Sequence, residues 1–383
     1  MRYSIFFAIC AILIACTTTE KLEKNPWLQT AATDGELRRS AQEAAYYLAS
    51  IQEKNGAFFY IKDPLGKCCP KRRSYRLVDH LNATYALLAA YEVEKDPRML
   101  AAGRAGIDFS MRFVDKASKK TMVKSLGLKP ASLMEHGFYL MMLSKYYSLT
   151  QDKTYLSLTK RFASFIEKNL QPGGVYQTAS GRSESLAIVG LFTYYGAEME
   201  KKPPMERALR YLEYLQNRGK KSEIFIQAVH AAARHVAVKR SLISFALESA
   251  DSMLANVWHN GSFSHDVRVG SRHGKLVSSG AAMRSEALMA AYSLARGYGF
   301  VAEANYLKRR GRENMAFLLQ FQYGTKGNLV AKNSKKARLL SMHDMQGGIF
   351  SSPSKGYVRI DAVAYHIRAA LFYIKARNAL ATP

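Results

Sequence analysis

The chain has 383 residues, of which 48% are hydrophobic, and its formal net charge is +26 at pH 7. This hydrophobic content is enough to bury a large core. The positive charge comes without a basic-helix DNA motif, an aromatic RNA-binding signature or a zinc knuckle, so a nucleic-acid partner is not expected. Anionic glycans, lipid headgroups and other acidic polymers are the partners that such a charge favours. General surface basicity is the alternative explanation.

The first fifteen residues (1–15) predict an export signal rather than a part of the fold. Arg2 precedes an apolar run, Ile5 to Ala15, that is too short to span a bilayer as a mature helix. The run ends in Leu13-Ile14-Ala15-Cys16, which resembles the lipobox of bacterial lipoproteins. The resemblance implies cleavage before Cys16 and lipid on Cys16. It also implies an outer-membrane anchor facing the periplasm, because Thr17 stands where inner-membrane lipoproteins usually carry aspartate. An ordinary signal peptide or an anchor helix is the alternative.

The mature chain divides into a tether and one domain. Residues 16–34 are polar and predict a flexible tether behind the lipidated cysteine. Residues 35–383 keep one helical rhythm throughout, which favours a single domain although the length alone allows two.

Two adjacent cysteines, Cys68 and Cys69, are the only ones in this domain. Neighbouring α-carbons lie about 3.8 Å apart, short of the usual disulfide span, so a strained vicinal disulfide and a pair of packed thiols both stay open. The two cysteines do not form a metal-ligand spacing, and we expect neither a metal nor a cofactor.

Apolar residues recur at i, i+3, i+4 and i+7 in segments that predict helices. The segment 79–94 is an example, because Leu81, Tyr85, Leu88 and Tyr91 form one stripe. The predicted helices lie near 36–54, 79–94, 97–114, 131–149, 153–169, 184–199, 203–217, 222–236, 240–258, 282–298, 300–320 and 360–379.

The connections between these helices alternate in length. Those after even-numbered helices are a few residues long, whereas those after odd-numbered helices are mostly much longer, and several contain a Gly-x-aromatic sequence. This alternation places the long connections at one end of the structure. The spacing of the hairpins is too irregular for an open solenoid, so six hairpins in a closed ring are expected.

The arrangement resembles the (α/α)-toroid superfamily of six-hairpin, glycosidase-like proteins. The resemblance implies an all-α (α/α)6 toroid with short β-hairpin loops at one end, where the substrate binds. It also implies a reaction on a glycan, although the fold alone does not name the reaction. No Asp-x-Asp-Asp sequence suits a terpene cyclase, and no Cys/His set suits a zinc-dependent lanthionine cyclase.

Four long linkers share a glycine, an aromatic residue and then an Arg followed by an acid at the start of the next helix. Their aromatic residues are Phe58, Tyr176, Phe263 and Phe350, and their Arg and acid pairs are Arg76 with Asp79, Arg182 with Glu184, Arg284 with Glu286, and Arg359 with Asp361. An acid in a first helical turn is stabilised by the helix dipole, so the pattern has a structural explanation. The functional alternative places these carboxylates around one substrate, with the arginines binding a substrate carboxylate.

Histidines beside acids are the second group of candidates. Asp79-His80 and Glu135-His136 stand at helix starts, while His265-Asp266 and His343-Asp344, with Tyr357 nearby, lie in long linkers. A histidine oriented by an acid can transfer protons near neutral pH, but each one alone is more often a capping or surface residue.

We therefore expect hydrolysis of a glycosidic bond in an acidic glycan by two carboxylates. Elimination or epimerisation at a uronate is a close variant, with His or Tyr as the base. The candidate catalytic residues are Asp79, His80, Glu135, His136, Glu184, Glu286 and Asp361. The candidate substrate-binding residues are Arg76, Tyr176, Arg182, Phe263, His265, Asp266, Arg284, His343, Phe350, Tyr357 and Arg359. A non-catalytic toroid that binds a polyanion or a protein partner is the alternative.

Overall fold

The computed structural model describes residues 32–62, 76–115, 132–171, 181–197, 205–255, 278–319, 321–322, 345–349 and 358–378. Several residues singled out from the sequence lie outside these ranges, so their predicted roles stay predictions. They are Cys16, Cys68, Cys69, Tyr176, Phe263, His265, Asp266, His343, Asp344, Phe350 and Tyr357.

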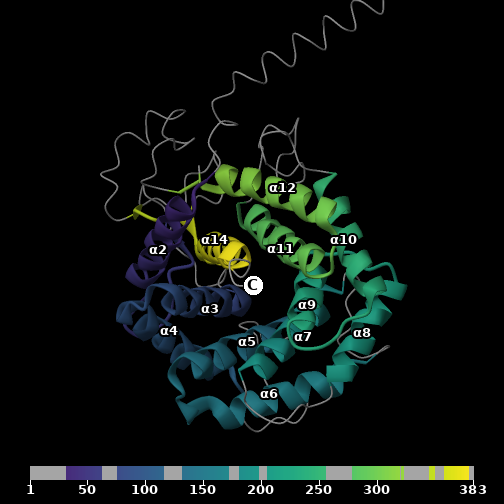
Figure 1. The fold of residues 1–383 in the computed structure, drawn as a ribbon. Helices are drawn as coiled ribbons and strands as arrows, with labels where there is room; N and C mark the ends of the chain where they lie inside the picture. The colour runs from purple at the N-terminus through teal and green to yellow at the C-terminus, as the bar shows by residue number, and fades with distance from the viewer. Residues whose placement is uncertain are drawn as a thin grey trace, which may run out of the picture.

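The described helices form two concentric sets (Figure 1). The inner set consists of α3 (Leu77–Glu94), α5 (Leu133–Thr150), α7 (Arg182–Gly196), α9 (Glu223–Ala233), α11 (Ser278–Gly297) and α14 (Ile360–Asn378). The outer set consists of α2 (Asp34–Ser50), α4 (Pro97–Ser110), α6 (Leu156–Asn169), α8 (Met205–Asn217), α10 (Arg240–Leu254) and α12 (Val301–Leu319). Two 3-10 turns, η3 (Met111–Phe113) and η4 (Lys153–Tyr155), extend α4 and precede α6.

The inner helices close into a ring. Each one contacts the next in the order α3, α5, α7, α9, α11 and α14, and α14 contacts α3 again. The outer helices cover this ring, with α2 on α14 and α3, α4 on α3, α6 on α5 and α7, α10 on α9 and α11, and α12 on α11. The predicted all-α toroid of six hairpins is therefore confirmed.

Small residues set the closest approach in the inner ring. A Cβ on Gly137 of α5 would lie 2.8 Å from the Leu186 carbonyl oxygen of α7, and one on Gly190 would lie 2.7 Å from the Gly137 carbonyl oxygen. Larger side chains fill the space between the two rings. Tyr139 of α5 stacks on Phe162 of α6 with ring centroids 4.9 Å apart, and both residues are fully buried. Burial of such aromatic surface is a major stabilising contribution.

Helix starts follow from local capping. The Asp96 side chain accepts a hydrogen bond from the Arg98 amide while Pro97 occupies the first turn of α4. Asp152 accepts from the Thr154 amide in the same way at η4. Thr33 and Glu36 form a reciprocal capping box at the start of α2.

The first and last long linkers use the same turn. Gly56 has φ +89° and Gly347 has φ +82°, and each lies against the backbone of a neighbouring outer helix, where a Cβ would be 2.1 Å from a carbonyl oxygen. Isolated antiparallel bridges join Gln52 with Phe58 in the first linker and Gln322 with Ile349 at the two ends of the last linker. Both positions therefore require glycine, because a residue with a Cβ would be strained there and would meet the neighbouring backbone.

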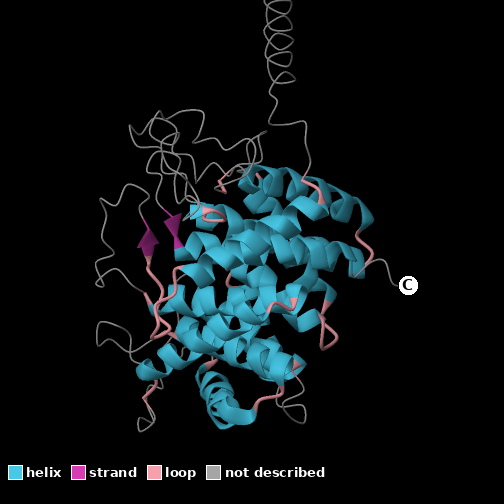
Figure 2. Cartoon of the chain, turned by 90° about the vertical axis from the view of Figure 1, so that its left-hand side faces the viewer, coloured by secondary structure: helices cyan, strands magenta, loops and turns pink. Residues whose placement is uncertain are grey.

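The same two linkers also pair with each other. Strand β1 (Ile61–Lys62) runs antiparallel to β2 (Val358–Arg359), with Ile61 opposite Arg359. The strands lie at one end of the helices (Figure 2). In the described residues this two-stranded sheet joins two linkers from opposite ends of the chain.

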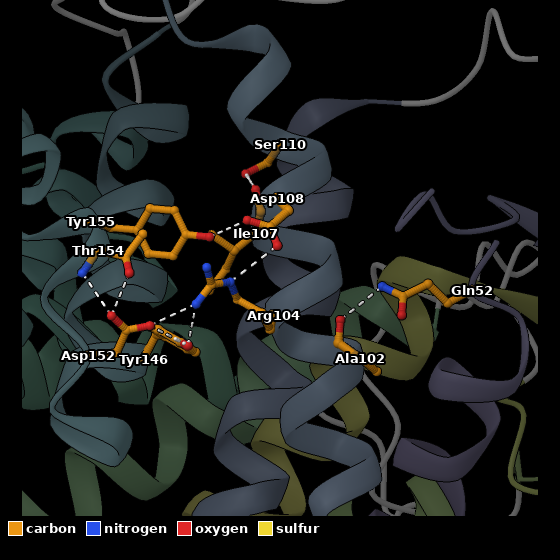
Figure 3. Close-up of polar contacts among 10 residues, drawn as sticks. All are labelled: Gln52, Ala102, Arg104, Ile107, Asp108, Ser110, Tyr146, Asp152, Thr154 and Tyr155. Atoms are coloured by element: carbon orange, nitrogen blue, oxygen red, sulfur yellow. Dashed lines mark hydrogen bonds and ion pairs between the residues drawn. The ribbon is translucent and has the colours of Figure 1, made fainter. Parts of the chain in front are cut away.

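An ion-pair network fastens the second and third hairpins on the outside of the ring (Figure 3). Arg104 of α4 donates to Tyr146 and to Asp152, both at 2.7 Å, and to Asp108 at 3.2 Å. Tyr155 donates to the other oxygen of Asp108, and its ring lies 4.8 Å below the Arg104 guanidinium.

Among the described helices, none combines the length and apolar character needed to cross a membrane.

Candidate functional site

The candidate site lies where the inner helices begin. Each inner helix follows a linker from an outer helix, so the first turns of the inner helices share one end of the ring, here called the rim. Acidic residues occupy several of these first turns, namely Asp79, Glu135, Glu184, Glu223 and Asp361. Carboxylates are favoured there because the amino ends of helices carry partial positive charge.

The first rim cluster lies where α3 meets α14, and we call it the α3–α14 cluster. Arg76 donates two hydrogen bonds of 2.8 Å to the buried carboxylate of Asp79. Arg359 donates to both oxygens of the buried Asp361, at 2.9 and 2.7 Å. It also donates to the hydroxyl of Tyr60 at 2.9 Å, which ties the first linker to α14. Bidentate pairs of this kind fix both the position and the orientation of a carboxylate.

The surroundings of Asp361 shift its pKa upward. Burial raises the pKa of Asp361, the charge of Asp79 raises it further, and Arg359 opposes the shift. Burial together with the charges of Asp79 and Asp361 raises the pKa of Tyr60 to about 12. Asp361 is therefore the described rim carboxyl whose protonated form is favoured by its surroundings.

The second rim cluster centres on Glu223, a residue that the sequence analysis missed. Glu223 is buried in the first turn of α9 and accepts from Arg182 of α7 at 2.7 Å and from Arg284 of α11 at 3.4 Å. We call these three residues the Glu223 cluster. Arg182 and Arg284 thus both bond to an acid of a neighbouring inner helix.

Glu286 lies below the rim, which corrects its predicted place at a helix start. Helix α11 begins at Ser278, so Glu286 is more than two turns inside it. Glu286 accepts from Arg368 of α14 at 2.8 Å, and Arg368 also donates to Asn82 of α3 at 2.7 Å. All three side chains are buried.

Arg368 occupies the middle of the ring. Its guanidinium lies 5.3 Å from the ring centroid of Tyr85, 5.5 Å from that of Tyr365 and 5.8 Å from that of Phe138. These contacts reach α3, α5 and α14, in addition to Glu286 on α11. Tyr85 and Tyr365 stay partly exposed beside it. Burial raises the pKa of Tyr365 to about 12, so its phenol stays neutral at ordinary pH.

Side chains of different inner helices meet at the end opposite the rim. His230 of α9 and Phe372 of α14 meet across it, with ring centroids 5.3 Å apart, although α11 separates their helices in the ring. Nearby, Glu92 of α3 accepts from Lys145 of α5 at 2.6 Å and also pairs with Lys375 of α14.

Two histidines predicted as catalytic candidates face the outer helices. His80 is fully buried, donates to the Gly106 carbonyl of α4 at 2.8 Å and lies between the rings of Phe58 and Phe109. His136 donates to the Ser132 carbonyl at 2.8 Å and stacks on Phe165 of α6. Burial lowers the pKa of each to about 4. This arrangement favours the packing interpretation, and neither histidine enters the proposal below.

The remaining rim acids have different surroundings. Glu135 accepts from the hydroxyl of Ser132, the residue that caps α5, and is partly exposed. Glu184 is buried in the first turn of α7. Among the described residues, no group of His, Cys, Asp and Glu has the arrangement of a metal site.

Glu223, Arg368 and Asn82 had weak sequence signals. Glu223 follows the short link 218–222, which lacks the Gly-x-aromatic sequence, although Ser222 before it is a recognisable N-cap. Arg368 is a single cation in the apolar stretch of α14, and such a residue is a signal of a buried ion pair.

Comparisons with known proteins identify the fold. No family model matches the chain, and no curated protein matches it. An unsaturated glucuronyl hydrolase specific for heparin shares 13% identity over 90% of this chain and 99% of its own, with a TM-score of 0.62. A cellobiose 2-epimerase from Bacillus thermoamylovorans shares 11% identity over 89% and 98%, with a TM-score of 0.60.

An α-1,6-mannanase from Salegentibacter sp. HEL1_6 shares 14% identity over 90% of this chain and 99% of its own, with a TM-score of 0.59. At such identities the likeness establishes the fold alone. The chain has the (α/α)6 toroid fold of the six-hairpin, glycosidase-like proteins.

Proposed function

We propose that the protein is an exported glycan-active enzyme that hydrolyses a glycosidic bond at the rim of the toroid. The observation that carries this proposal is the α3–α14 cluster, in which two buried carboxylates lie close enough for the charge of Asp79 to raise the pKa of Asp361. Glycoside hydrolysis requires two neighbouring carboxyl groups, one of which gives a proton to the leaving oxygen. Structural neighbours that act on glycans support the choice.

Asp361 is assigned as the acid and Asp79 as its partner. The proton of Asp361 passes to the glycosidic oxygen as the bond to the anomeric carbon breaks. Asp79 either takes a proton from the attacking water or attacks the anomeric carbon itself, after which water releases the sugar. Arg76, bonded to both oxygens of Asp79, orients that carboxylate.

The described side chains favour hydrolysis over elimination or epimerisation. A base that removes a proton near neutral pH needs a pKa near that pH. Burial lowers the pKa of His80, His136 and His366 to about 4, and it raises the pKa of Tyr60 and Tyr365 to about 12. Within the described ranges these residues are therefore poor bases. His265 and His343, outside those ranges, are the candidates for the alternative reaction.

An acidic glycan is the proposed substrate class. The chain carries a net charge of +26, and Arg76 and Arg182 at the rim leave 64% and 43% of their side chains exposed. Exposed guanidinium groups bind carboxylates and sulfates in two-point contacts. We further propose that lipid on Cys16 holds the protein at the bacterial outer membrane, facing the periplasm.

The test is a glycan panel read by mass spectrometry, with the wild-type protein, Asp79→Asn and Asp361→Asn. Each variant is expected to lose at least about 100-fold in turnover, in line with the loss of a general acid or base. Asp108→Asn, in the outer network of Arg104, is the matched control and keeps wild-type turnover. Wild-type turnover in both rim variants contradicts the assignment.

A non-catalytic glycan-binding toroid is the second candidate. Two observations favour it. Asp79, Asp361 and Glu223 are each bonded to arginine. The chain also contains no two consecutive acidic residues, whereas a variant of the Salegentibacter mannanase with two consecutive aspartates replaced is inactive. Heat of binding to the panel without any product identifies this function.

A further inference from the structure

The middle of the ring contains polar atoms without partners. Oε2 of Glu286, Nε of Arg368, Nδ2 of Asn82 and Nε2 of Gln227 have no hydrogen-bond partner among the described residues. Each of these side chains belongs to a residue at least 93% buried. We call these four residues the axial layer. They come from four inner helices, α11, α14, α3 and α9.

Contacts place Gln227 in the same layer as Arg368. His230 and Phe372 meet across the ring, Gln227 lies one turn before His230, and Arg368 lies one turn before Phe372. Residues three or four apart share a helix face, so both Gln227 and Arg368 face the ring interior one turn closer to the rim.

Packing alone does not account for this layer. Buried polar atoms without partners destabilise a fold. A buried ion pair can often be replaced by apolar residues of similar volume without loss of stability. The layer also adjoins Tyr85 and Tyr365, which stay partly exposed although they stand in the inner ring. Accessible aromatic surface therefore lies next to donors and an acceptor that lack partners.

We propose that the axial layer, with Tyr85 and Tyr365, binds the hydroxyl groups of the terminal sugar of a glycan. Glu286 accepts hydrogen bonds from sugar hydroxyls, while Asn82, Gln227 and Arg368 donate to them. The charges of Glu286 and Arg368 cancel, which favours neutral hydroxyls over an anion at this depth. The tyrosine rings pack against the apolar face of the sugar.

The contact between His230 and Phe372 adds a specificity. Because these two side chains meet across the ring beyond the layer, the proposed glycan ends there. The layer therefore binds the end of a glycan chain. The hydrolysis proposed at the α3–α14 cluster releases sugars from that end. The release of sugars by hydrolysis rests on the proposed function. Binding of the chain end does not, since binding is measured separately.

The test is a double variant, Arg368→Met with Glu286→Leu, which replaces the buried ion pair by apolar side chains. Ser40→Ala with His366→Phe is the matched control. His366 also lies in α14 and bonds to Ser40 of the outer helix α2 at 2.6 Å, away from the ring interior. Both double variants are expected to unfold at or above the wild-type urea midpoint.

Binding is measured by calorimetry with the methyl glycosides of mannose, glucose, N-acetylglucosamine and glucuronic acid. At least one binds the wild-type and control proteins, and the axial variant binds it at least 10-fold more weakly. The single change Gln227→Leu, which leaves the ion pair in place, weakens binding in the same direction. Equal binding by the axial variant and the wild type, or no wild-type binding of any of the four, overturns the proposal.

Product analysis separates this inference from the proposed reaction. If binding depends on the axial layer but no product forms, the sugar-binding role of the layer is supported and the proposed hydrolysis is contradicted. If the axial variant keeps wild-type turnover, the role of the layer is contradicted and the proposed hydrolysis is supported. With oligosaccharide substrates, release of single sugars or of one short end product supports a chain-end site, whereas products of mixed length contradict it.

Discussion

The guanidinium of Arg182 lies 2.7 Å from the carboxylate of Glu223, although the two residues begin different inner helices. Arg284 of α11 approaches the same carboxylate, at 3.4 Å. One buried acid thus joins the beginnings of α7 and α9 to the second turn of α11. In the α3–α14 cluster, Arg359 bonds to Tyr60 of the first linker, where the two ends of the ring meet.

Glu223→Gln is expected to destabilise the protein by roughly 1–3 kcal/mol, because two arginines lose a charged partner in a largely buried position. Urea unfolding measures the loss. Glu206→Gln is the matched control, since Glu206 pairs with Arg210 at 3.5 Å on the exposed face of α8 and such pairs contribute about 0–1 kcal/mol. Equal losses in the two variants contradict the bridging role of Glu223.

The buried histidines predict a loss of stability in mild acid. Burial lowers the pKa of His80, His136 and His366 to about 4, whereas an unfolded histidine titrates near 6.5. Between these values the unfolded chain binds more protons, so the free energy of unfolding falls as the pH falls from 6.5 towards 4. At pH 5 each histidine accounts for roughly 2 kcal/mol of this loss.

Urea unfolding at pH 7 and pH 5 checks this prediction, with His366→Phe for comparison. The variant should show a smaller difference between the two pH values than the wild type. Asp361 has the opposite effect on the pH dependence of stability. Because its pKa is raised in the folded state, it stabilises the fold at low pH, and this contribution is lost as the pH rises through that pKa. An unchanged pH dependence in the variant would show that His366 is not buried in its neutral form.

Three glycine-to-alanine changes separate the steric cost of a new Cβ from the cost of a positive φ. Gly56→Ala should cost at least about 2 kcal/mol, because its φ is +89° and the new Cβ meets the Ala105 carbonyl oxygen. Gly219→Ala, at φ +61° with open space around it, should cost about 1–2 kcal/mol. Gly35→Ala, in a helix with open space, should stabilise by up to about 1 kcal/mol. Thermal unfolding ranks the three, and a different order refutes the assignment.

Arg104→Met tests whether the outer network is separate from the site. The change removes the hydrogen bonds to Tyr146, Asp152 and Asp108 (Figure 3). We expect a loss of roughly 1–2 kcal/mol in unfolding free energy, since the arginine is partly exposed. Glycan binding and turnover at 25 °C should stay at the wild-type level. A selective loss of binding without destabilisation would place the network in the functional site.

The fold was largely predictable because its determinants are local. The stripe of Leu81, Tyr85 and Leu88 defines a helix within a few residues of its observed bounds, and Asp96 with Pro97 marks where the next one begins. Helix α11 was the main error, since it starts at Ser278 rather than near 282. No proline or capping aspartate marks its beginning, so Glu286 was assigned to the rim instead of the ring interior.

The site was less predictable because its pairs join helices that are far apart in the sequence. Arg76 with Asp79 is a local pair and was recognised. Arg182 has an acid, Glu184, two residues away in the same helix, yet it pairs with Glu223 of the neighbouring helix. His80 stands beside Asp79, but successive side chains on a helix point about 100° apart, so it faces α4 while Asp79 bonds to Arg76.

The amino-acid sequence by itself determined the helices, their caps and the alternation of short and long connections, because these depend on residues within one or two turns. Only the tertiary structure decided which charges meet. Arg368 finds Glu286 and Asn82 because ring closure brings α11, α14 and α3 together, and the 286 positions between Asn82 and Arg368 leave no local pattern to reveal it.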